Sequence, residues 1–139
     1  MIILDTNVVS ALMHTEPDAV LVQWLDKQPH DSVWLTAVSI FEIRFGIDVL
    51  GPSRRRRQLE EGFARVLDRG FRERIISLDE HCAAAAASLA AERKRHGTTV
   101  DLRDTLIAGI VLSRRATLAT RNTRHFEDID ARVVDPWQT

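Results

Sequence analysis

The feature that most constrains the fold of this chain is the alternation of short apolar runs with longer segments of helical period. The apolar runs are MIIL (1–4), VWLT (33–36), RIISL (74–78), ATLAT (116–120) and ARVVDP (131–136). The intervening segments that predict helices are residues 6–13, 17–28, 37–50, 54–70, 80–97 and 101–115. Short strands that alternate with helices are typical of parallel β–α–β connections. The sequence therefore predicts an α/β domain whose short, mainly parallel central sheet is flanked by helices.

Several of the expected helix ends carry recognisable signals. Thr6 precedes the first helical run as a candidate N-cap, and Asp79 does the same for residues 80–97. Gly51 and Pro52 follow the segment 37–50 and are expected to end it. These signals divide the helical segments without any linker, so we expect one domain over residues 1–139.

Composition excludes several classes of protein. The single cysteine, Cys82, cannot form an internal disulfide, which fits a reducing cytosol. MIIL has no basic region of the kind that begins a signal peptide, and Asp5 interrupts the apolar run early, so no signal peptide is expected. No apolar run approaches the ~20 residues of a membrane span. The formal net charge of −1 does not by itself indicate nucleic-acid binding. We expect a cytoplasmic protein without a membrane partner.

Three acids lie where apolar residues are expected. Asp5 directly follows the first strand, and ligands of parallel sheets bind at the carboxyl ends of strands. Glu42 shares a helix face with Val38, Phe45, Gly46 and Val49, and Asp104 shares one with Ile107, Ala108 and Val111. Desolvating an unpaired carboxylate costs several kcal/mol, so each acid needs a partner. That partner is an arginine, a shared proton or a divalent cation.

Local structure offers an alternative explanation for each polar position. Asp101 and Asp104 have the spacing of a helix N-cap and an acid in the first turn. Glu42 could form an ion pair with Arg44 or with another arginine, and Asp5 is placed to cap the helix that follows it. Thr120, Arg121 and Asn122 follow the strand ATLAT, either as site residues at a strand end or as a plain loop with an Asx turn.

Taken in order along the chain, these residues carry a resemblance to a known family. LDTN at the start, the glutamate of SIFEIRFG, the aspartate of RDTLIAG, ATRNTRHF and the ending DPWQT resemble the motifs of PIN-domain ribonucleases. The closest subgroup is the VapC-type toxins of bacterial toxin–antitoxin modules. The resemblance covers essentially the whole chain, with the motifs in the expected order and separation.

The resemblance implies an activity and a set of site residues. The family cleaves RNA with Mg²⁺ or Mn²⁺, and its metal-binding acids correspond to Asp5, Glu42 and Asp104. Its strand-end polar pair corresponds to Thr6 and Asn7. These two residues, together with Thr120, Arg121 and Asp101, are expected to contact the substrate or to support the metal-binding acids. The fourth catalytic position, which is acidic in many members, corresponds to Asn122. It keeps an oxygen ligand, with Asp101 as an extra acid nearby, but a second tightly held metal is not implied. The resemblance also implies a VapB-like antitoxin, a homodimer, and a larger toxin–antitoxin assembly on operator DNA.

Two further interpretations remain open. The run Arg54, Arg55, Arg56 and Arg57 is either a rim that binds RNA phosphates or a solvated surface run. Because of Asn122, the chain could also be a catalytically weak PIN-like module that acts mainly through its antitoxin and DNA complexes. A phosphoacceptor receiver domain is excluded, since only one acid follows the first strand and VWLTAV supplies none.

Overall fold

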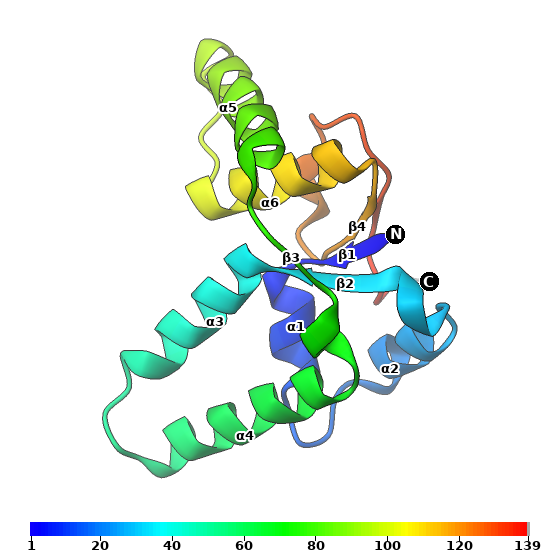
Figure 1. Ribbon diagram of the computed structural model, residues 1–139, viewed down its shortest axis with the longest axis vertical. Helices are drawn as coiled ribbons and strands as arrows, with labels where there is room; N and C mark the ends of the chain where they lie inside the picture. Colours follow the sequence, from blue (N-terminus) through cyan, green and yellow to red (C-terminus); the bar gives the residue numbers. More distant parts are fainter. Residues whose placement is uncertain (139) are drawn as a thin grey trace.

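The computed structural model describes residues 1–138 and shows one five-stranded sheet with every strand parallel to its neighbours (Figure 1). The strands are β1 (Ile2–Leu4), β2 (Val33–Thr36), β3 (Ile75–Ile76), β4 (Thr117–Ala119) and β5 (Val133–Val134). Their order across the sheet is β3-β2-β1-β4-β5. The expected α/β class is confirmed, and all five expected strands are present within residues 1–138: β2 has the expected bounds, and the other four are shorter than expected.

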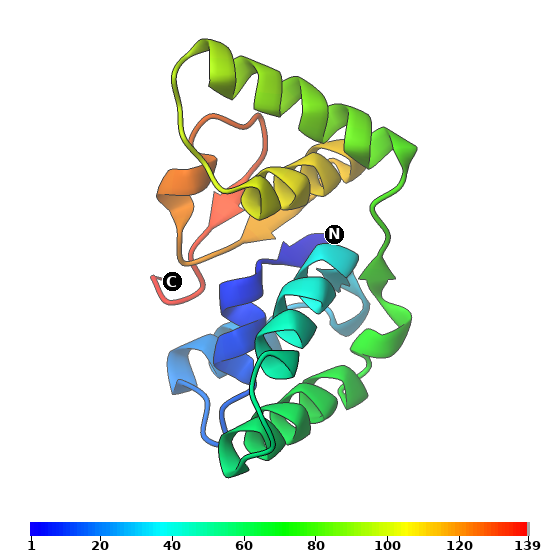
Figure 2. The ribbon, with the colours of Figure 1, turned by 90° about the vertical axis from the view of Figure 1, so that its left-hand side faces the viewer.

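Helices cover both faces of the sheet (Figure 2). One face is covered by α1 (Thr6–Leu12), α2 (Ala19–Asp26), α3 (Ala37–Asp48) and α4 (Arg54–Asp68), and the other by α5 (Glu80–Arg95) and α6 (Leu102–Arg114). Three short 3₁₀ helices were not expected: η1 (His30–Ser32), η2 (Phe71–Glu73) and η3 (Thr123–Phe126). The last of these lies directly after β4 and carries part of the site described below.

The pleat of the strands separates two apolar cores. In β1, Leu4 belongs to the cluster under α1 to α4, whereas Ile3 belongs to the cluster under α5 and α6. In β4, Ala119 and Leu118 divide in the same way. Successive side chains of a strand point to opposite faces, so strands buried on both sides read as continuous apolar runs. This explains why MIIL and ATLAT have no polar alternation.

A glycine allows α5 and α6 to approach closely. A Cβ on Gly109 of α6 would lie 2.6 Å from the Ala86 Cβ and 2.6 Å from the Cys82 carbonyl oxygen of α5. Those distances are shorter than van der Waals contact, so any side chain at this position forces the helices apart. The close packing holds α6, and with it Asp104, at a fixed distance from α5.

The topology places a switch point at the carboxyl end of β1. From β1 the chain builds β2 and β3 on one side, and then crosses through α5 and α6 to β4 on the other side of β1. Ligands of open parallel sheets bind in the crevice outside the strand ends at such a point. Asp5 and Thr120, which follow β1 and β4, therefore meet at the position where a site is expected.

The expected helix ends need two corrections. The first is that α3 ends at Asp48, with Val49 as its C-cap, two residues before the end expected from Gly51 and Pro52. Asp79 and Asp101 cap α5 and α6 as expected, and Ser53, which was not predicted as a cap, caps α4; each does so through a side-chain oxygen. Thr6, however, is the first residue of α1 rather than its N-cap; the cap is Asp5, whose carboxylate accepts a hydrogen bond from the Thr6 backbone N–H. The expectation was wrong by one residue: Asp and Thr are both good caps, and the helix already includes Thr6, so the residue before it takes the capping position.

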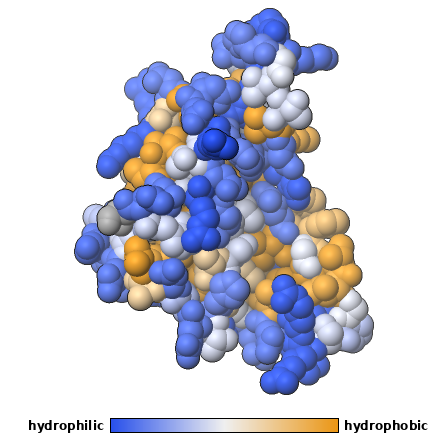
Figure 3. All heavy atoms as spheres, turned by 180° about the vertical axis from the view of Figure 1, so that it is seen from behind, coloured by the Kyte–Doolittle hydropathy of each residue, from blue (hydrophilic) through white to orange (hydrophobic). Residues whose placement is uncertain are grey.

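The surface also has an apolar region. Seen from behind, apolar side chains gather on the side of the molecule where α3 lies (Figure 3). Phe41, Phe45 and Val49, one helical turn apart along α3, are each more than half exposed. Within residues 1–138, none of the helices has both the length and the apolar character needed to cross a membrane.

Candidate active site

Asp5 lies at the end of β1, and its buried carboxylate accepts three hydrogen bonds. Oδ1 accepts from the Thr6 backbone N–H at 2.8 Å, and Oδ2 accepts from the Thr120 hydroxyl at 2.7 Å and from the Asn7 side-chain amide at 3.2 Å. The Asn7 amide also donates to Thr120 Oγ1 at 3.2 Å. This network joins the ends of β1 and β4 and fixes the orientation of the Asp5 carboxylate.

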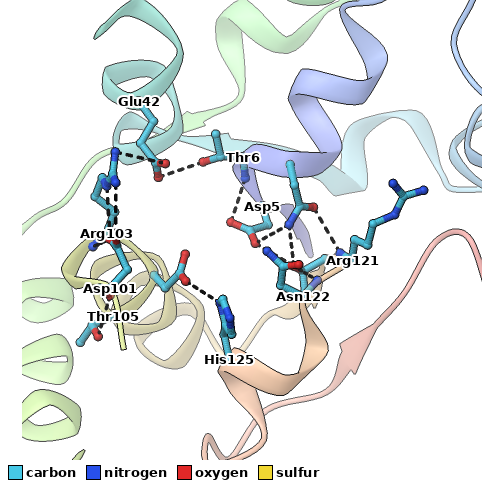
Figure 4. A network of polar contacts seen from close by, with 12 residues as sticks. Asp5, Thr6, Glu42, Asp101, Arg103, Thr105, Arg121, Asn122 and His125 are labelled. Atoms are coloured by element: carbon cyan, nitrogen blue, oxygen red, sulfur yellow. Dashed lines mark hydrogen bonds and ion pairs between the residues drawn. The ribbon is translucent and has the colours of Figure 1, made fainter. Parts of the chain in front are cut away.

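Glu42 reaches the same region from α3. Its Oε1 accepts a hydrogen bond from the Thr6 hydroxyl at 3.0 Å, and Thr6 Oγ1 also contacts the buried Ser39 hydroxyl at 2.8 Å. Thr6 therefore connects the two acids, with its N–H on Asp5 and its hydroxyl on Glu42. Figure 4 shows Glu42, Asp5 and His125 pointing toward one another from three different parts of the chain.

The helical reasoning that placed Glu42 on a core-facing stripe needs correction. Phe45 and Val49 are 54% and 63% exposed, and Gly46 is exposed as well. The buried face of α3 is formed by Val38, Ser39, Ile43 and Ile47 instead. Glu42 lies at the boundary between the two faces, where its carboxylate reaches the site. Arg44 is not the arginine partner of Glu42, since it forms its ion pair with Asp48 at 3.1 Å. The alternative of another arginine is borne out by Arg103.

Asp104 enters from the first turn of α6. Its expected neighbours Ile107, Ala108 and Val111 are fully buried, so the helix phase was read correctly. Asp104 Oδ2 lies 2.9 Å from Nδ1 of His125, a residue of η3. Sequence reasoning missed His125, and the only available signal was its place three residues after Asn122 in the motif that follows β4. The two side chains close the site on the side of α6.

The acids share an electrostatic environment that disfavours negative charge. Burial raises the pKa of Asp5, against the opposing hydrogen bonds from Thr120 and Thr6, and the Asp104 charge adds to the rise. Burial likewise raises the pKa of Glu42, the Thr6 hydroxyl and Arg103 oppose it, and the charges of Asp5 and Asp104 contribute to the increase. Three carboxylates that repel one another at the edge of a core are stabilised by a bound cation.

Asp101 and Arg103 flank this group from the solvent side. Asp101 caps α6 through the Arg103 backbone N–H at 2.7 Å, and its carboxylate also accepts from the Arg103 side chain. The Arg103 guanidinium lies 4.0 Å from Glu42 Oε2. This arginine, also missed from the sequence, holds the pKa of Asp101 below its ordinary value. Asp101 is therefore a helix cap with its own ion-pair partner, as the structural alternative proposed.

A buried arginine fixes the segment that carries His125. The Arg93 side chain of α5 is 4% exposed and forms a double hydrogen bond to Asp128, with both distances 2.8 Å. It also donates to the His125 carbonyl oxygen at 2.9 Å and to Thr105 Oγ1 at 2.8 Å. Arg93 thus ties η3 to the first turn of α6, next to Asp104. The pKa of Asp128 is lowered by this arginine.

The remaining expected residues differ in their involvement. Thr120 is buried and is central to the Asp5 network, since its hydroxyl also accepts from the Asn122 backbone N–H at 3.0 Å. Asn122 directly precedes η3, and its side chain has no hydrogen bond to an acid within the described part of the chain. The Arg121 backbone N–H donates to Asn7 Oδ1 at 3.2 Å, while its side chain points away from Asp5 (Figure 4).

The arginine run at the start of α4 divides into different roles. Arg56 is engaged within the protein, with Glu60 at 2.9 Å and the Leu50 carbonyl oxygen at 2.8 Å. Arg55 lines a groove of about 430 Å³ between α1, α3 and α4, and Glu42 and Thr6 lie along the same groove. A uniform rim of four arginines is not what the structure shows, but Arg55 does face a surface that leads to the site.

The acids of the site offer carboxylate oxygens, the ligands that a hard divalent cation prefers. Among residues 1–138, no three Asp, Glu, His or Cys side chains stand close enough together to enclose a metal ion. Mg²⁺, however, is commonly held by one or two carboxylates together with water and substrate phosphate rather than by an all-protein cage. Asp5, Glu42 and Asp104 offer carboxylate oxygens in an environment that favours positive charge, so the residues present fit such an ion.

Comparison with known proteins agrees with the fold. The PIN domain family matches residues 2–132. The chain is 36% identical over 138 residues to the plasmid stability protein StbB of Pseudomonas syringae pv. tomato, and 30% identical over 138 residues to the VapC ribonuclease Y4jK of Sinorhizobium fredii, with 99% of each chain covered in both cases. The crystal structure of FitAcB from Neisseria gonorrhoeae is similar with a TM-score of 0.86, 34% identity and complete coverage of both chains. A structure of FitAB bound to an IR36 DNA fragment matches at 34% identity with a TM-score of 0.85, covering 99% of this chain and 96% of that one.

The matched residues span almost the entire chain. This chain therefore belongs to the PIN domain family. The resemblance in its motifs to VapC-type proteins is confirmed by relatives that carry that name.

Proposed function

We propose that this chain is a metal-dependent endoribonuclease and the toxin of a toxin–antitoxin module. The observation that carries the proposal is the convergence of Asp5, Glu42 and Asp104 at the switch point of the sheet, from positions far apart in the sequence. The relatives named as ribonucleases and toxins support the same class of reaction.

The chemistry follows from the residues. Asp5, Glu42 and Asp104 would hold Mg²⁺ or Mn²⁺, which when bound supplies an activated water and neutralises charge on the scissile phosphate. Thr6 and Thr120 orient the carboxylates of Asp5 and Glu42 by donating hydrogen bonds to them. Since each carboxylate is already fixed before substrate arrives, little reorganisation is needed for catalysis.

The partner proposed for this site is an antitoxin of the VapB type. The groove between α1, α3 and α4 extends from Glu42 past Ile43, Gly46 and Ile47, and Arg55 lies on its α4 side. An apolar groove next to a charged site suits an extended or helical segment of a partner chain. The similar FitAB structure contains DNA, which supports assembly on an operator, and a homodimer of this chain is part of the same proposal.

The test measures RNA cleavage by the antitoxin-free chain. We expect cleavage in Mg²⁺ or Mn²⁺ and none in excess EDTA, because the ligand set is all oxygen. Full activity in the chelator would refute the metal dependence. No cleavage of total RNA in either metal would favour the alternative, a catalytically weak module that acts through antitoxin and DNA binding.

A pair of variants on α6 locates the reaction. Asp104→Asn keeps the volume and removes one repelling charge, so melting in EDTA should occur at the same or a higher temperature while cleavage falls by orders of magnitude. Asp101→Asn removes the same charge one helical turn away and preserves the cap, so it serves as the matched control. A large loss of melting temperature in Asp104→Asn with activity retained would remove Asp104 from the site.

A further inference from the structure

One arginine beside the site has a stacking partner but no acidic one. The Arg121 guanidinium carbon lies 3.8 Å from the ring centroid of Trp137, a distance typical of stacking of the guanidinium on the indole face. Within residues 1–138, no carboxylate forms an ion pair with Arg121. Arg103, on the other side of the acids, has its charge shared between Asp101 and Glu42. The acids thus lie between one neutralised cation and one that is free to bind an anion.

The indole ring of Trp137 fixes the position of the Arg121 guanidinium. Trp137 follows β5 in a turn closed by its backbone N–H on Asp135 Oδ1 at 2.9 Å, and its side chain packs partly against the core under α1 and α2. The Arg121 backbone is fixed by Asn7, the residue that also donates to Asp5. Both ends of the arginine are therefore tied down, and its side chain is held away from the acids, as Figure 4 shows.

We propose that Arg121, stacked on Trp137, binds the RNA nucleotide next to the scissile phosphate. Arginine presents a planar fork that binds phosphate oxygens in pairs, and a guanidinium plane with one free face can stack an RNA base. Trp137 acts as a positioning residue, because its ring holds the guanidinium in place next to the strand end that carries Thr120. The inference rests on the proposed ribonuclease function and names a subsite of the same site.

Binding of a labelled single-stranded RNA dodecamer of mixed sequence tests the subsite without catalysis. The dissociation constant is measured by fluorescence anisotropy in EDTA over a series of KCl concentrations. It is measured for the wild type and for single variants of it. Arg121→Gln is expected to weaken binding about tenfold at low salt and to reduce the salt slope by about 0.7, the value for one lost phosphate contact on a single strand. Arg132→Gln is the matched control, because Arg132 is exposed and precedes β5 at the opposite end of the strand.

The role of Trp137 is tested by a conservative and a disruptive change. Trp137→Phe keeps an aromatic face and should retain binding, whereas Trp137→Leu should weaken it several-fold. In cleavage assays with Mn²⁺, Trp137→Leu should raise KM and leave kcat nearly unchanged, since the acids are untouched. A purely structural role for the stack predicts instead a lower melting temperature with wild-type RNA affinity.

The outcomes separate this inference from the proposed function. If wild type cleaves RNA but Arg121→Gln binds like Arg132→Gln, the subsite is refuted and the ribonuclease function stands. If wild type binds RNA through Arg121 but does not cleave in Mg²⁺ or Mn²⁺, the enzymatic proposal fails while the binding role of Arg121 is retained. A wild-type chain that does not bind the dodecamer at all overturns the subsite.

Discussion

The buried Arg93 and its partner Asp128 lead to an unequal pair of mutational effects. The Arg93 side chain is 4% exposed, whereas that of Asp128 is 43% exposed. Removing the arginine leaves a carboxylate that water can reach; removing the aspartate leaves a buried guanidinium without its counter-charge. We therefore expect Asp128→Ala to destabilise the fold more than Arg93→Met does, although the same ion pair is lost in both.

The contacts of Arg93 set the magnitudes. In Arg93→Met, the hydroxyl of Thr105 keeps its hydrogen bond to the Asp101 carbonyl oxygen, so the His125 carbonyl oxygen is the main acceptor left unpaired. One such buried group costs about 1–3 kcal/mol. Breaking a buried ion pair from the other side costs about 3–5 kcal/mol, and the partial exposure of Asp128 favours the lower end. At about 2.1 cal/mol/K of unfolding entropy per residue, 3 kcal/mol lowers the Tm of this 139-residue chain by about 10 °C.

Thermal melts in EDTA, with urea titrations to obtain free energies of unfolding, give the order of stability. Wild type should be most stable, Arg93→Met and the double variant should follow at similar values, and Asp128→Ala should be least stable. Similar free energies of unfolding are expected for Arg93→Met and the double variant. Once Arg93 is replaced, Asp128 has lost its ion-pair partner, so removing its partly exposed carboxylate changes stability little. An Arg93→Met protein clearly less stable than Asp128→Ala would refute the reasoning from unequal burial.

Three other changes give separate tests. Asp101→Ala should cost ~1 kcal/mol through loss of the α6 cap and keep most RNA cleavage; a normally stable but inactive variant would place Asp101 in the reaction instead. Because the folded-state pKa of Asp5 is raised above 3.8, the folded protein holds more protons than the unfolded chain above that pH, so this group's ionisation reduces stability as pH rises. In EDTA, the stability of Asp5→Asn relative to wild type should therefore increase from about pH 3 to pH 7, and a decrease would reverse the assigned sign. Gly109→Ala should cost about 1–3 kcal/mol by forcing α5 and α6 apart, whereas Gly46→Ala, with open space at its Cβ on α3, should stabilise by up to about 1 kcal/mol; equal melting temperatures would contradict the packing argument.

The fold was predictable because burial on both faces of a parallel sheet leaves apolar runs that stand out in the sequence. Asp5 and Asp104 were accessible to the same reasoning, since a strand end and a fully buried helix face fix their directions. Glu42 was placed at the site by the family motif, while the phase argument used for it was wrong. Its neighbours Phe45 and Val49 are apolar yet exposed, and hydrophobicity alone does not distinguish a core face from a surface that another chain covers.

The contacts of His125, Arg103 and Arg93 were not predictable for a different reason. Each depends on how η3, α3, α5 and α6 are positioned relative to one another, to within a few tenths of an ångström. A 3₁₀ helix of four residues has no periodic signal of its own. The motif ATRNTRHF indicated a polar segment at a strand end, but the direction of each of its side chains follows from tertiary packing.

The central position of β1 has a consequence for a protein that is being synthesised. Asp5 leaves the ribosome among the first residues, but its backbone N–H bonds to the Ala119 carbonyl oxygen at 2.9 Å and its carboxylate bonds to Thr120. Those partners are translated more than a hundred residues later. A nascent chain that already contains Asp5, Glu42 and Asp104 therefore lacks the strand that fixes the first of them. Most of the chain must therefore be synthesised before the site can assemble.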